Sequence, residues 1–307
     1  MKQEESQKTD DIVEIVERVL NRRSFVKGAG VTGAGLIGAT FLGAKTGMLD
    51  KIPGAHAVGL HSTSVEAASI TDADILNFAL NLEYLEAEFY TVATTGKTIE
   101  QIGIGTGGVG EPGPTSGGKR VHFERDRGDW HWSGDEVSGR LHAIAEEIAY
   151  DEQQHVILLR SALGSAAIAK PAINLDALGI GFDTFQQFLV LARAFEDTGV
   201  SAYGGAAPLI TSKAYLATAA RIALTEALHS ANLRLLIAEN HVKTSPLDSL
   251  DILPPPSGKQ YFEVDKQALA VVRTTSQVLA IAYASSAPGT SKGGFFPNGV
   301  NGNINTV

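Results

Sequence analysis

The chain has 307 residues, of which 44% are hydrophobic and 19% charged, a composition typical of a globular protein long enough to bury a large core. The formal net charge of −9 argues against nucleic-acid binding, and the absence of cysteine excludes disulfides, thiolate catalysis and cysteine-ligated metals. Any metal would be held by carboxylate and imidazole, which suit iron, manganese or zinc. The Ala-rich periodic segments and few aromatic residues favour helices over a β-sandwich.

The first segment has the features of an export signal. Arg22 and Arg23 open a run that resembles the bacterial twin-arginine motif, and residues 28–44 form a weakly apolar stretch that is too glycine-rich for a stable membrane helix. Residues 55–57, Ala-His-Ala, then offer a cleavage site. We predict that residues 1–57 are a signal peptide read by the twin-arginine translocase, and that the mature chain is periplasmic or extracellular without stable membrane insertion. A disordered basic N-terminus and an uncleaved anchor are the alternatives.

Four long helices follow from the spacing of apolar residues. Their predicted ranges are 72–93, 134–163, 184–203 and 212–239.

Sequence signals at the helix ends support these ranges. Thr71 and Ser133 each precede an acidic residue three positions later, so each opens a capping box. Gly164 is a stop for the second helix, and Gly204 and Gly205, with a proline shortly after them, are predicted to end the third.

The connections indicate how these helices are arranged. The link 165–182 is long enough to cross a bundle, whereas the third and fourth helices are joined by a short turn. We predict an all-α four-helix bundle with a long crossover over 58–262. A C-terminal helix, 264–284, and a tail are predicted to pack on it over 263–307.

A Gly-rich insertion over 97–132 separates the first two helices of the bundle. It contains His122, Trp130, His131 and Trp132. Packing as a surface loop is the simpler interpretation, and a cap over a site entrance is the alternative.

Two Glu-x-x-His motifs stand on the second and fourth predicted helices. They are Glu152 with His155 and Glu226 with His229. Residues three apart share a helix face, so each pair can hold one metal from one side. Each motif alone is weak evidence, because a solvated Glu beside a satisfied His is common.

The first and third helices carry a matching pattern. Glu83 and Glu196 are each followed seven residues later by a tyrosine, Tyr90 and Tyr203. Each tyrosine then lies on the face of its glutamate, about 10 Å along the axis. The two halves of the chain therefore repeat one another, and four ordered pairs on four helices are far less expected by chance than one.

Charge supports a dinuclear site. Four inward-facing glutamates would repel one another in an apolar core, and two divalent ions would supply four positive charges. Glu86 and Glu88 compete with Glu83 for the first position, and Glu83 is preferred because its tyrosine spacing matches that of Glu196. The alternative is that some of these glutamates face solvent.

This ligand set resembles that of ferritin-like di-iron and di-manganese bundles. Over residues 70–304 the chain more specifically resembles the desiccation-related ferritin-like family, through the segments DADILNFALNLEYLEAEFY and GGFFPNGVNGNI. The resemblance implies two ions, iron or manganese, with Glu152 and Glu226 bridging them. Glu83 and His155 would complete one ion, and Glu196 and His229 the other.

Neighbouring residues suggest that the two ions differ. Asp151 precedes Glu152, and Asp-Glu-x-x-His resembles a pattern of di-iron oxygenases in which the Asp orients a ligand. The equivalent residue in the second motif is Thr225, so we expect the two ions to differ in affinity. An exposed helix charge is the alternative for Asp151. Tyr90 and Tyr203 are expected either to tune the site or relay electrons, or to be core aromatics that tie their hydroxyls to a carboxylate.

The leading functional hypothesis is a redox-active two-metal protein that reacts with oxygen or peroxide and protects against stress such as drying. The alternative is a non-catalytic protective protein in which the metals only stabilise the bundle. A storage cage is disfavoured by the insertion and tail. The metal, the substrate, any catalytic residue and assembly as a homo-oligomer remain open at this level.

Overall fold

The structure is a computed structural model that describes residues 70–123 and 134–307, excluding the side chains of 134–138. The predicted signal peptide, Trp130, His131, Trp132 and Ser133 lie outside the described residues. Within the described ranges, no helix is long and apolar enough to cross a membrane.

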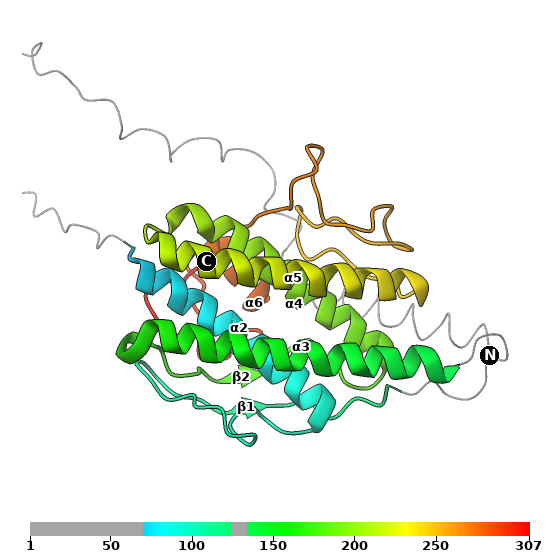
Figure 1. Cartoon of the computed structure of the whole chain (residues 1–307), viewed down its shortest axis with the longest axis horizontal. Helices are drawn as coiled ribbons and strands as arrows, with labels where there is room; N and C mark the ends of the chain where they lie inside the picture. The colour runs from blue at the N-terminus through cyan, green and yellow to red at the C-terminus, as the bar shows by residue number, and fades with distance from the viewer. Residues whose placement is uncertain (1–69, 124–133) are drawn as a thin grey trace, which may run out of the picture. The chain divides into compact units, whose positions relative to one another are not determined.

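Four long helices form the bundle (Figure 1). They are α2 Asp72–Thr95, α3 Gly134–Leu163, α4 Phe185–Ala206 and α5 Lys213–Glu239. Helix α2 packs along α3, and α4 packs along α5, while α2 also contacts α4. The predicted all-α bundle is confirmed.

The ends of these helices follow from local hydrogen bonds. Thr71 forms a capping box at the start of α2, as predicted, and Gly96 ends that helix with a φ of 75°. The hydroxyls of Thr184 and Ser212 accept a backbone N–H at the starts of α4 and α5. Gly164, with a φ of 56°, follows the last residue of α3, so the predicted stop is confirmed.

The end of α4 differs from the prediction. Gly204 and Gly205 do not end the helix, which runs on to Ala206 and into a 3₁₀ turn, Ala207–Leu209. A Cβ on Gly205 would lie 1.9 Å from the Arg273 carbonyl oxygen. The glycine is therefore explained by the close approach of another backbone segment, and not by helix termination.

The predicted fifth helix over 264–284 is wrong in its first half. Only α6, Thr275–Ala282, is helical, and it packs against α4. In the preceding segment, the Asp265 carboxylate accepts the backbone N–H groups of Gln267 and Leu269, and Ala268 has a φ of 61°. This side-chain turn offers the backbone an alternative to the helix.

The Gly-rich insertion and the crossover lie side by side. Strand β1, Thr115–Ser116, pairs in parallel with β2, Ile173–Asn174, and a 3₁₀ turn, Gly164–Ala166, leads into the crossover. Buried Lys170 lies 2.7 Å from the Thr115 hydroxyl and 3.2 Å from the Glu88 carboxylate. These contacts fasten both segments to α2.

Candidate metal centre

The six predicted ligand residues come together at the centre of the bundle. Helices α2 and α4 contribute one glutamate each, and α3 and α5 contribute a glutamate and a histidine each. All four glutamates are 0% exposed and both histidines 7% exposed. The six residues are Glu83, Glu152, His155, Glu196, Glu226 and His229.

These residues form two overlapping groups. In each group, one ligand atom per residue lies within 4.8 Å of the others. The first group is Glu83, Glu152, His155 and Glu226, and the second is Glu152, Glu196, Glu226 and His229. Glu152 and Glu226 belong to both, so two ions held here would share two carboxylates.

Both imidazoles present Nδ1 to the carboxylates. His155 Nδ1 lies 3.2 Å from oxygens of Glu83 and Glu152. His229 Nδ1 lies 3.0 Å from a Glu152 oxygen and 3.2 Å from one of Glu196. Ligands about 2.1 Å from one ion sit roughly 3 Å apart, so these spacings suit coordination of a common cation.

Five carboxylate oxygens of the cluster are buried with no hydrogen-bond donor in bonding geometry among the described residues. They are Glu83 Oε2, Glu152 Oε1, Glu196 Oε1, Glu226 Oε1 and Glu226 Oε2. Buried carboxylate oxygens without partners are costly. The donor set therefore fits a pair of cations, and these buried acidic and histidine groups could hold metal ions.

Burial and mutual repulsion favour the protonated form of some of these carboxyl groups, and the carboxylates favour protonated imidazoles. Burial, and then the Glu152 charge, raises the pKa of Glu226 well above its usual range. Burial and the Glu83 charge raise the pKa of Glu152 to about 7. Burial opposes the charging of His229, but the Glu196 and Glu152 carboxylates outweigh it and raise the pKa of His229 to about 12.

Each tyrosine faces the glutamate of the opposite half of the chain. The Tyr203 hydroxyl donates a hydrogen bond to Glu83. The Tyr90 hydroxyl has no hydrogen bond within the described residues, yet burial and then the nearby charge of Glu196 raise the pKa of Tyr90. Tyr203 thus fits the interpretation of a core aromatic that positions a carboxylate.

Glu86 is a fifth carboxyl at the centre, which the sequence indicated only as a competitor of Glu83. A Cβ on Gly199 would lie 2.4 Å from Glu226 Oε2 and 3.1 Å from Glu86 Oε1, so the glycine leaves room for both groups. Burial and the charge of Glu226 raise the pKa of Glu86 well above its usual range. Glu88 instead pairs with Lys170, away from the cluster.

Asp151 contacts only one of the two histidines. Its Oδ2 lies 3.1 Å from His229 Nε2, and its side chain is 33% exposed. The Thr225 hydroxyl donates to the Arg221 carbonyl, 3.2 Å away, and no carboxylate contacts His155 Nε2 in the described part of the chain. Among the described residues, His229 therefore has a carboxylate partner at Nε2, whereas His155 does not.

This difference yields a paired prediction. Asp151→Asn should weaken binding of the ion at His229 by about 10- to 100-fold, because that imidazole loses the carboxylate that orients it. Thr225→Asp should instead tighten binding at His155. Competitive titration against a chelator measures both affinities, and equal affinities in the unaltered protein would contradict the predicted asymmetry.

A separate acidic group consists of Asp197, Asp251 and Glu263. Arginines already neutralise it: Arg193 lies 2.8 Å from Asp197 and 2.6 Å from Asp251. This group is an ion-pair network, and it needs no metal for neutralisation.

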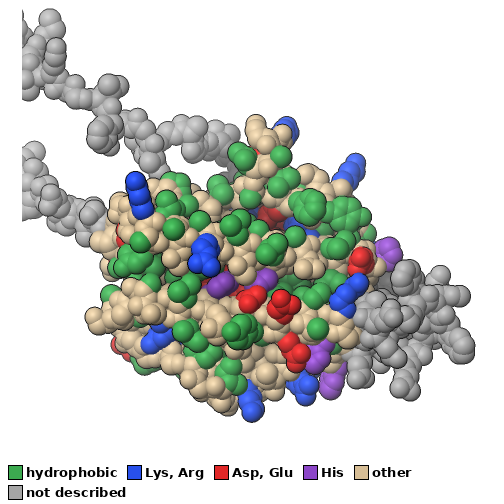
Figure 2. Space-filling view, in the orientation of Figure 1, with side chains coloured by type: hydrophobic (Ala, Val, Ile, Leu, Met, Phe, Trp, Pro, Cys, Tyr) green, Lys and Arg blue, Asp and Glu red, His purple; other side chains and the backbone are tan. Residues whose placement is uncertain are grey.

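The centre lies close to the surface along one face. Figure 2 shows acidic and histidine side chains gathered among hydrophobic ones in the middle of the face formed by α3 and α5. Asp151 is the partly exposed acid that touches His229. Exposed Leu224 and Leu228 lie on α5. Asp151 therefore connects the buried His229 imidazole to the solvent-exposed face.

Comparison with known proteins agrees with the fold. Residues 71–239 match the family model described as a ferritin-like domain, a span that holds all four bundle helices and all six residues of the cluster. No curated protein matches the chain. Since the match covers more than half of the 307 residues, the chain belongs to the ferritin-like domain family.

Proposed function

We propose that this protein binds two iron or manganese ions and reacts with dioxygen or hydrogen peroxide. The observation that carries the proposal is the pair of overlapping groups that share Glu152 and Glu226, with five buried carboxylate oxygens that accept no well-formed hydrogen bond within the described residues. Two bridging carboxylates are the arrangement that holds two cations close enough to act on one small molecule.

The residues of the chain have distinct parts in this proposal. When bound, two ferrous or manganous ions would supply the two electrons that, with two protons, reduce hydrogen peroxide to two waters, and a second peroxide molecule, oxidised to dioxygen with release of two protons, would return those electrons. Glu83 and Glu196 would each hold one ion, and Tyr203 fixes the carboxylate of Glu83 through its hydrogen bond. Asp151 holds the imidazole of His229. Glu86 keeps a carboxyl group beside Glu226, whose charge together with burial raises the pKa of Glu86 well above its usual range.

We further infer an exported, protective role. The twin-arginine pattern at Arg22 and Arg23 and the cleavage site at 55–57 support export by the twin-arginine translocase. The likeness of residues 70–304 to desiccation-related ferritin-like proteins supports a role in stress such as drying. Such a protein would remove oxidants outside the cytoplasm.

A second candidate is a protein in which the metals only stabilise the bundle. The observation in its favour is that each ligand group takes residues from both helix pairs, α2 with α3 and α4 with α5. Bound ions would therefore join the two halves of the bundle, and metal ligation would contribute folding free energy.

One experiment separates the candidates. Protein purified from its native compartment is analysed for metals and for its N-terminal residue, and is then assayed for consumption of peroxide and oxygen. We expect about two ions per chain, an N-terminus at Val58, and turnover that Glu152→Gln abolishes and Glu147→Gln, at an exposed site on the same helix, leaves unchanged. Two ions without turnover would favour the stabilising role, and protein without iron or manganese would refute both. An intact N-terminus in the cytoplasm would refute export.

A further inference from the structure

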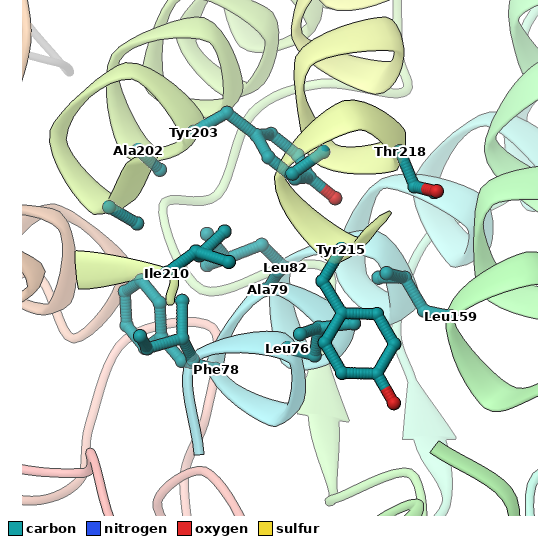
Figure 3. A pocket seen from close by; sticks show the side chains of 13 residues that line it. Leu76, Phe78, Ala79, Leu82, Leu159, Ala202, Tyr203, Ile210, Tyr215 and Thr218 are labelled. Carbon is teal, nitrogen blue, oxygen red and sulfur yellow. The ribbon is translucent and has the colours of Figure 1, made fainter. Parts of the chain in front are cut away.

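An apolar cavity lies in the bundle (Figure 3). Its volume is about 20 Å³. A cavity volume of about 10–15 Å³ is enough to hold one molecule the size of water. Side chains from all four bundle helices line it, among them Ala79, Leu82, Leu159, Tyr203 and Ala219.

The cavity lies one helical turn from ligand residues on α2 and α3. Tyr203 lines it, and the hydroxyl of that residue donates to Glu83. Ala79 lies one turn before Glu83 and Leu159 one turn after His155, each about 6 Å along the helix axis. A guest in the cavity would therefore be separated from the carboxylates by little more than the Tyr203 side chain.

The residues that line the cavity determine which kind of molecule it can hold. The cavity has three side-chain hydroxyls, and all three are used elsewhere: Tyr203 donates to Glu83, Tyr215 to the Ala162 carbonyl at 3.5 Å, and Thr218 to the Ala214 carbonyl at 3.2 Å. Every other lining residue is apolar. A buried water needs two to four polar partners, so this cavity suits a small apolar molecule.

We propose that this cavity holds dioxygen beside the metal centre. Of the two oxidants in the proposed function, dioxygen is apolar and two atoms long, whereas hydrogen peroxide would lose its hydrogen bonds to water without replacement. The inference rests on the proposed function for the choice of oxidant, but the apolar site itself exists without metal. Peroxide would instead approach from the polar side, beside Asp151.

Xenon tests the site without metal, because it is an apolar atom that enters dry cavities. Metal-free protein is examined by xenon NMR and in crystals pressurised with xenon. We expect xenon next to Tyr203, with affinity at least tenfold lower in Ala79→Leu, which fills the cavity. The matched control is Ala194→Leu, which lines a different pocket against Leu247 and Phe295 and should retain xenon beside Tyr203. If Ala79→Leu does not fold, Ala219→Val serves instead.

Oxygen consumption by metal-loaded protein tests the role of the cavity. We expect Ala79→Leu to slow oxygen consumption about tenfold while peroxide consumption changes less than twofold. Absence of xenon from the folded wild type, or equal slowing of both oxidants, would overturn the inference without touching the proposed function. Xenon binding with no oxygen or peroxide consumption would overturn the proposed function and the dioxygen role, and would leave only an apolar cavity.

Discussion

Loading the metal-free protein with two ferrous or manganous ions should raise its melting temperature by roughly 10–20 °C. Each ion at about 100 times its dissociation constant adds about 2.7 kcal/mol of stability, and a domain of this size shifts by about 2–4 °C per kcal/mol. The physical reason is the set of five buried carboxylate oxygens that, in the described part of the chain, accept no well-formed hydrogen bond and that the ions would satisfy. Differential scanning calorimetry under anaerobic conditions measures the shift.

The same loading should release protons. At pH 7 both imidazoles of the metal-free centre are protonated, because the neighbouring carboxylates raise the pKa of His155 and His229, and about half of Glu152, whose pKa is about 7, holds a proton. Because the ligands must be deprotonated to bind metal, at least about two protons should be released per pair of ions. Metal affinity should therefore fall as the pH drops through 7, where Glu152 takes up its proton.

Glu152→Gln provides the control for this stabilisation. The variant should lose most of the metal-dependent shift, because Glu152 belongs to both ligand groups. Without metal it should be at least as stable as the wild type, since one buried carboxylate has been removed. Glu147→Gln, exposed on the same helix, should behave like the wild type. A metal shift that survives in Glu152→Gln would contradict the proposed coordination.

The helices and the central cluster could be predicted because their signals are local. The spacing of three between Glu152 and His155 places both on one helix face, and the repeat of Glu-x6-Tyr identified Glu83 among three nearby glutamates. The structure brings the six residues together, and their role as metal ligands stays a prediction. The contact of Asp151 with His229 joins two different helices, so no spacing within one helix predicts it.

One misjudged segment depends on a contact between residues far apart in the chain, and the other on a local side-chain turn that competes with the helix. Gly205 has the sequence signal of a helix stop, but its reason is the Arg273 backbone packed against it. The segment before α6 has helical spacing, yet the Asp265 carboxylate turns it. Glu86 could have been predicted as a further carboxyl of the cluster, because it lies one helical turn from Glu83. The space for it, however, comes from Gly199 on another helix, where a side chain would clash with Glu226 and Glu86.

Asp197→Asn should lower the free energy of unfolding by about 3–5 kcal/mol, the usual cost of removing one partner of a buried ion pair. The Asp197 carboxylate lies 2.8 Å from Arg193, 2.7 Å from Arg234 and 2.6 Å from the Ser230 hydroxyl. Both arginines are fully buried. Without the aspartate, Arg234 would be left with backbone carbonyls alone, including that of Ile252 at 2.5 Å.

The loss of unfolding free energy in Asp197→Asn should be the same with and without metal. A substitution of a metal ligand should instead have an effect that depends on metal. Asp197 and Glu196 are neighbours on α4, and their side chains leave the helix about 100° apart. The charge of Glu196 would be offset by a metal ion, whereas arginines already offset that of Asp197. Urea unfolding of metal-free and metal-loaded protein measures both losses. Asp183→Asn, in the exposed pair with Lys119, should cost less than about 1 kcal/mol. An Asp197→Asn loss no larger than this control, or one seen only with metal bound, would mean that the arginine network does not support the fold independently of the centre.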